Sequence, residues 1–193
     1  GGIASPTDNV TNLQFSDQEI MAIVDEAKRS GTYVMAHAYT PEALMRCVRL
    51  GVRSLEHANL LDDESAKYIA EHDAFVVPTL AIYEAFYTHG EEFGAPPHVM
   101  KKLTGVRRQA INALKVAHDN NVNVGFGTDL LGKLMQFQST EFSIRKQVET
   151  PFQTLHSATY KNAQLLNMEG KLGVLQAGAF ADILAVKSNP LEV

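Results

Sequence analysis

Short strand-forming segments alternate with helix-forming segments four times along this 193-residue sequence, and this alternation limits the folds open to the chain. Helices placed between strands return the chain to the same edge of a sheet, so that successive strands run parallel. The expected strands cover residues 33–36, 52–56, 74–78 and 122–126. The sequence therefore predicts an α/β fold, in which helices pack outside a parallel sheet.

Capping residues mark where several helices begin and end. Ser16-Asp17-Gln18-Glu19 is a capping box of the S-x-x-E type, so a helix should start at about Asp17 and stop at Gly31. Thr40-Pro41 is typical of the start of a second helix, which Gly51 ends. Further helices are expected at residues 62–72, 98–120, 140–148 and 151–166, and residues 83–97 are expected to form a polar loop.

Four strand–helix units are half of what a closed barrel requires. A (β/α)8 TIM barrel has eight such units and typically about 250 residues. We therefore expect residues 1–170 to form the C-terminal half of a barrel, strands five to eight, with the first half upstream of Gly1. A half barrel exposes two unpaired strand edges, which predicts either a homo-oligomer or pairing with the missing N-terminal half.

The last segment has a different character. Residues 171–193 contain glycine-rich turns and then a strand-like run, residues 181–186, with no helix after it. This pattern predicts the beginning of a separate small β domain.

Composition and charge exclude some functions. The chain is 45% hydrophobic and 20% charged, as is usual for a soluble globular protein. A net charge of −5 with no basic block argues against nucleic acid as a partner, and no apolar run is long enough to span a membrane. The single cysteine, Cys47, cannot form an internal disulfide and fits a cytoplasmic protein. No signal-peptide pattern is found.

Two histidines occupy positions where chemistry is expected in a parallel barrel. His37 and His57 each end a predicted strand, and one helix separates them. All such strand ends meet on one face, and neighbouring strands lie about 4.8 Å apart, so both imidazoles can reach one metal ion. Asp129 follows the fourth strand in Gly125-Phe126-Gly127-Thr128-Asp129. Two histidines and a carboxylate suit zinc with one position open for water. The alternative is two core or helix-capping histidines and an aspartate in a turn.

At these residues the sequence resembles the amidohydrolase superfamily, in its imidazolonepropionase-like and prolidase-like (Xaa-Pro dipeptidase) branch. Residues 34–39, 54–59 and 125–129 resemble the metal-binding strands five, six and eight of that family. The segments at residues 1–7, 158–163 and 173–182 resemble the loop after strand four, the helix after the barrel and the return to a β-sandwich domain. The resemblance thus implies that residues 171–193 start the C-terminal part of that sandwich.

The resemblance implies a zinc hydrolase, with one or two metal ions, that cleaves amide or peptide bonds. A dipeptidase or carboxypeptidase acting on small peptides is expected. His37 and His57 would bind the more exposed metal, and Asp129 would bind the other metal and act as general base. Tyr39 resembles a tyrosine that hydrogen-bonds the substrate.

Two departures from the family qualify this expectation. The His-x-His pair of strand one and the carboxylated lysine of strand four are absent, so the second metal site is incomplete and the chain alone should be inactive. A ring hydrolase of the cyclic-amide or deaminase type, which usually needs one metal, is the alternative enzyme. A non-catalytic fragment is the alternative of another class.

The remaining candidates are weaker. Glu56 precedes a ligand, so its side chain is expected on the opposite face, toward the helices. The aromatic residues of the expected loop either line a substrate pocket or pack in a core: Tyr83, Phe86 and Tyr87. Surface or helix-end positions are expected for His72, His89, His98, His118 and His156.

Overall fold

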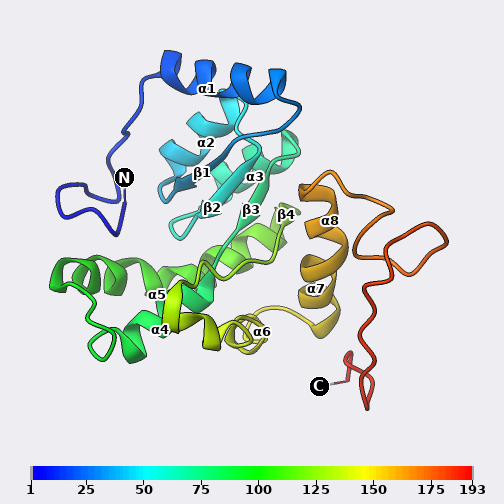
Figure 1. Ribbon diagram of the computed structural model, residues 1–193. Coiled ribbons are helices and arrows are strands. Elements are labelled where there is room, and N and C mark those ends of the chain that lie inside the picture. Colours follow the sequence, from blue (N-terminus) through cyan, green and yellow to red (C-terminus); the bar gives the residue numbers. More distant parts are fainter. Residues whose placement is uncertain (1, 193) are drawn as a thin grey trace.

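A four-stranded parallel sheet forms the centre of the molecule. The computed structural model describes residues 2–192 (Figure 1). The strands lie side by side in chain order: β1 Met35–Ala38, β2 Ser54–His57, β3 Phe75–Val77 and β4 Asn123–Val124. Each neighbouring pair is parallel, which confirms the predicted α/β fold.

The helices between and before the strands start where the capping residues predict. The Ser16 hydroxyl accepts the Glu19 amide and the Glu19 carboxylate accepts the Ser16 amide, so α1 begins at Asp17. Thr40 caps the next helix through the Ala43 amide. The bounds of these helices are α1 Asp17–Arg29, α2 Pro41–Arg49, α3 Asp63–Glu71 and α5 Pro97–Asp119.

The polar loop expected at residues 83–97 is wrong in its first half. Helix α4, Leu80–His89, occupies it and packs on α5. Its first turns are buried, including Ala81 and Tyr83, so contact with α5 stabilises a helix whose sequence has little amphipathic pattern.

Residues 132–165, which follow β4 after a short loop, are mostly helical. A short 3-10 helix, η1 Gly132–Phe137, precedes α6 Thr140–Arg145, which is shorter than expected. The helix expected at residues 151–166 forms as three consecutive pieces: α7 Pro151–His156, the π-helical η2 Ser157–Lys161 and α8 Asn162–Leu165.

The strand expected at residues 181–186 is wrong for this structure. These residues have no regular secondary structure, and the tail passes beside α7 (Figure 1), where Pro190 lines a pocket with Phe142 and Leu155. Apolar side chains there face solvent, with Leu184 87% exposed. A strand requires a hydrogen-bonded neighbour, and the described residues supply none for this segment.

Two apolar cores position the carboxyl ends of the strands. The larger core lies between the sheet and the helices and includes Leu44, Leu55 and Ile69, all fully buried. The second core surrounds Tyr39 and Ala81 beyond the strand ends. The residues at the carboxyl ends of the strands are therefore supported by packed apolar side chains. No helix in the part described is long and apolar enough to span a membrane.

Candidate metal centre

His37 and His57 meet at the carboxyl end of the sheet. Nδ1 of His37 lies 2.7 Å from Nε2 of His57, and the two rings stack with their centroids 4.9 Å apart. They come from adjacent strands, in which Ala38 pairs with His57. The sequence-based prediction that these two imidazoles converge agrees with this arrangement.

Thr79 orients the buried imidazole of His57. The Thr79 hydroxyl lies 2.7 Å from His57 Nδ1 and can accept a proton carried there, an arrangement that leaves a lone pair on Nε2. Burial and the neighbouring His37 lower the pKa of His57 to about 3. The ring is therefore neutral at physiological pH, as a metal ligand must be.

The chemistry of this histidine pair fits a zinc ion. Two nitrogens that bind one tetrahedral zinc at about 2.0–2.1 Å lie about 3.3 Å from each other. The nitrogens that face each other here are 2.7 Å apart, so the rings need to separate by only about 0.6 Å. Sequence analysis did not identify Thr79, the partner that fixes the second ring.

Asp129 follows β4 at the same end of the sheet, near enough to His37 to be affected by its charge. Desolvation raises the pKa of its carboxyl group, and the nearby His37 partly opposes that shift. Within residues 2–192, however, no three His, Cys, Asp or Glu side chains are grouped closely enough to hold a metal ion. Asp129 is therefore near the histidine pair, but it is not joined to it in a three-ligand cluster.

Left-handed backbone conformations are concentrated at these strand ends. His57 (φ 80°), Thr79 (φ 47°) and Asp129 (φ 54°) follow or end β2, β3 and β4. Such a value is unusual for most residues and costly for a β-branched one such as threonine. Backbone strain of this kind is found at functional sites, where the surrounding structure maintains it.

Two tyrosines pack against the His57 ring. Tyr39 stacks on His57 with centroids 5.1 Å apart, and burial, opposed by a hydrogen bond with Tyr83, raises the pKa of Tyr39 to about 12. Tyr83 meets the His57 ring edge-on and donates its hydroxyl hydrogen to Asn59 Oδ1 at 2.8 Å. Tyr39 and Tyr83 therefore belong to the same cluster as His57. Tyr87, by contrast, packs on Arg107 at the surface.

The expectation for Glu56 is wrong. Strand register pairs Glu56 with His37, and Leu55 packs in the core on the helix side, so Glu56 faces the opposite way, toward the side of His37. Burial raises the pKa of Glu56, and the negative charge of Asp129 adds to that shift. Regular alternation of side chains along β2 would place Glu56 on the face opposite His57. The positive φ of His57 turns the His57 side chain out of this alternation, so the prediction for Glu56 failed.

A comparison with protein-family models covers nearly the whole chain. The model of the amidohydrolase family matches residues 7–192. The chain belongs to the amidohydrolase family.

Several relatives of this amidohydrolase are prolidases or related hydrolases. A prolidase solved in complex with N-methylphosphonate-L-proline is 50% identical, with a TM-score of 0.97 over 100% of this chain and 47% of that one. A Xaa-Pro dipeptidase with bound methionine is 32% identical, with a TM-score of 0.84 over 94% of this chain and 45% of that one. Ochratoxinase from Aspergillus niger is 29% identical over 193 residues, which are 40% of its length. The chain therefore spans less than half of each of these relatives.

Proposed function

We propose that this chain is the second half, strands five to eight, of the barrel of a zinc-dependent hydrolase that cleaves C–N bonds in small peptides. The complete protein would consist of this chain together with the residues that supply the rest of the barrel. The proposal extends to residues 171–193, which would start the C-terminal part of a β-sandwich domain. The exposed apolar side chains of that tail support it, because a sandwich would bury them.

The observation that carries the proposal is the approach of His37 Nδ1 to His57 Nε2, with Thr79 on the opposite nitrogen of His57. Ligating histidines are usually held by such a partner on their second nitrogen. Zinc bound there would lower the pKa of a water molecule and polarise the scissile carbonyl. His37 and His57 would hold one ion, and Asp129 would help to hold a second ion where two are present.

The other side chains have roles that follow from their positions. Asp129 would accept the proton of the attacking water, because its carboxylate lies near His37 and its raised pKa makes it a better base. Tyr39, buried against His57, would donate a hydrogen bond to the substrate. The similarity to a prolidase and to a Xaa-Pro dipeptidase supports dipeptides with proline in the second position as the substrates of the complete protein.

The test of this function is hydrolysis by the zinc-loaded complete protein. We expect turnover of Xaa-Pro dipeptides that a chelator abolishes and added zinc restores. His57→Asn should lose both bound zinc and activity, because it removes one of the two imidazole ligands. Product release and zinc content, measured on the same samples, check both effects.

His72→Asn is the matched control. His72 is the C-cap residue of α3, and its Nδ1 lies 2.8 Å from the Tyr68 carbonyl oxygen, so this variant should retain zinc and activity. Zinc content unchanged by His57→Asn would refute the metal site. Turnover of cyclic amides or amino-substituted rings, without turnover of dipeptides, would favour the ring hydrolase instead.

Tyr39→Phe tests the substrate contact. The variant keeps the stacked ring but removes the hydroxyl, and we expect kcat/KM to fall by about 10-fold, since a single hydrogen bond contributes about 0.5–1.5 kcal/mol. Zinc content should not change. Steady-state kinetics on Xaa-Pro dipeptides provide the measurement, and an unchanged kcat/KM would remove Tyr39 from the substrate site.

A further inference from the structure

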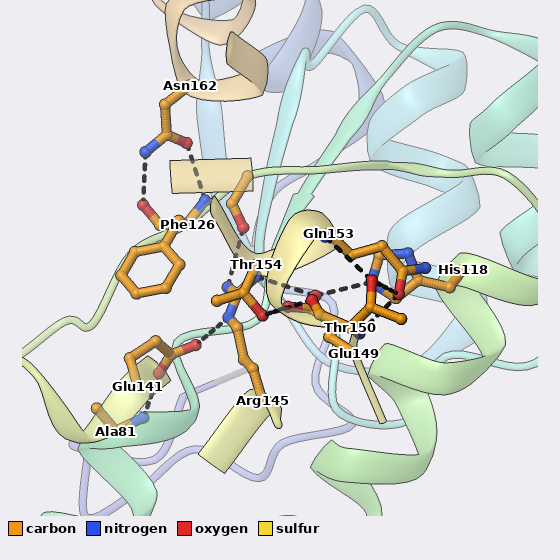
Figure 2. A network of polar contacts seen from close by, with 11 residues as sticks. Ala81, His118, Phe126, Glu141, Arg145, Glu149, Thr150, Gln153, Thr154 and Asn162 are labelled. Carbon is orange, nitrogen blue, oxygen red and sulfur yellow. Dashed lines mark hydrogen bonds and ion pairs between the residues drawn. The ribbon is translucent and has the colours of Figure 1, made fainter. Parts of the chain in front are cut away.

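A fully buried ion pair lies beside the two turns that carry the site residues. Arg145 and Glu141 are one helical turn apart on α6, both are 0% exposed, and Arg145 Nε lies 2.7 Å from Glu141 Oε1 (Figure 2). Buried ion pairs often stabilise a fold no more than apolar side chains of similar volume would. Stability alone therefore does not explain this pair, but its other contacts suggest a role.

Glu141 reaches the turn that holds Thr79. Its Oε2 accepts the Ala81 amide at 2.6 Å (Figure 2), from 60 residues away in sequence. Thr79 is the N-cap residue of α4, but its hydroxyl contacts His57 instead of capping the helix. The first amides of a helix need partners from outside the helix. Glu141 supplies one of them and so leaves the Thr79 hydroxyl available to orient His57.

Arg145 reaches the turn that leads to Asp129. Its Nη2 donates to the Gly125 carbonyl oxygen at 2.9 Å, and its guanidinium lies 4.6 Å from the Phe126 ring centroid. Asn162 fixes the same segment, because it accepts the Phe126 amide and donates to the Phe126 carbonyl oxygen (Figure 2). Asp129 follows three residues later, in a left-handed conformation.

Glu149 completes the set of charges. Its Oε1 lies 3.4 Å from Arg145 Nη1 and 2.7 Å from His118 Nε2, and its Oε2 accepts the Thr154 hydroxyl. Burial opposes ionisation of Glu149, but the hydrogen bond from His118 and the charge of Arg145 outweigh it and lower its pKa. Arg145 is thus held between two carboxylates and has little freedom to move.

We propose that Glu141 and Arg145 are positioning residues that set the separation between the Thr79–His57 contact and the turn carrying Asp129. The pair touches both turns and lies between them. The proposal rests on the proposed function to the extent that His57 and Asp129 act together. The orientation of His57 by Glu141 does not depend on catalysis and can be measured separately.

The test compares variants of the pair in the complete protein. Glu141→Met removes the acceptor for the Ala81 amide, whereas Glu141→Gln retains an oxygen that can accept it. We expect Glu141→Met to move the imidazole 15N resonances of His57 in zinc-free protein and to weaken zinc binding by about 10–100-fold. Glu141→Gln should restore most of both. Zinc affinity is measured by competition with a chromophoric chelator.

Arg145→Met tests the second contact. It removes the hydrogen bond to the Gly125 carbonyl oxygen. We expect kcat to fall by about 10–100-fold with a smaller change in KM, since this turn is proposed to place the base Asp129 and not to bind the substrate. Arg107→Met is the matched control. Arg107 pairs with Glu84 at 2.6 Å and lies over the Tyr87 ring, but this pair joins α4 to α5 at the surface. It should change none of these readouts.

Each outcome bears on the proposal. If folded Glu141→Met and Arg145→Met keep wild-type His57 resonances, zinc affinity and kcat, the pair is only structural and the proposal is wrong. If either variant fails to fold, the milder Glu141→Asp and Arg145→Lys decide, because a shorter carboxylate and a single ammonium group cannot make all of the original contacts. Wild-type readouts in both would overturn the proposal, and intermediate losses of zinc affinity and kcat would support it. If the wild-type protein binds no zinc, the proposed function fails, but the His57 resonances still test the role of Glu141.

Discussion

Asp129→Asn is expected to lower kcat of the complete protein by about 10²–10⁴-fold, the usual contribution of general-base catalysis. Asparagine is nearly isosteric with aspartate and adopts the left-handed conformation at least as readily, so the φ of 54° at this position remains favourable. The fold should therefore be retained. The lost property is the carboxylate, which alone can accept a proton from the attacking water.

Loss of activity could also arise from loss of metal, because an amide is a weaker ligand than a carboxylate. Bound zinc measured alongside kcat separates the two routes. A suitable control is Asp73→Asn, since Asp73 also has a positive φ (52°) but precedes β3 at the other end of the sheet. If Asp129→Asn keeps its zinc and a near-wild-type kcat, the base lies elsewhere in the complete protein.

The order of strands and helices could be predicted because local signals determine it. The capping groups of α1 and α2 are each contained within four residues, and the structure confirms both helix starts. Helix α4 had no such signal, since its N-cap, Thr79, makes no side-chain capping bond and its amide partner is Glu141. The expected strand at residues 181–186 failed for a related reason: strand formation depends on a neighbour that the described residues do not contain.

The histidine pair could be predicted from the sequence because strand ends of a parallel sheet share one face. The residues that support the pair and the neighbouring turn, Thr79 and Arg145, could not be predicted. Thr79 lies 22 residues from His57, and Arg145 lies 20 residues from Gly125, so both contacts depend on the finished fold. Glu56 was misplaced because the prediction assumed regular alternation at a residue whose neighbour, His57, has a positive φ.

The 193-residue chain alone is expected to hydrolyse Xaa-Pro dipeptides at least about 10³-fold more slowly than the complete protein. Even outer partners of a metal ligand contribute about 10–100-fold each, and the proposed site needs ligands from strands one and four that this chain does not carry. The sheet is also open at β1, where Met35 is 61% exposed and Phe15 is 55% exposed. These side chains line an apolar groove beside the strand, which further barrel strands would cover.

Mixing this chain with a separately produced first half of the barrel tests whether the missing half supplies the lost activity. Strand edges and apolar surface favour association of the two halves, and we expect the mixture to recover zinc binding and a large part of kcat. A first half in which the strand-one histidines are replaced by asparagine is the control: it should associate, as gel filtration would detect, without restoring turnover. Equal kcat for the isolated chain and the complete protein would show that His37, His57 and Asp129 suffice, and that the ligands expected from the first half are not required.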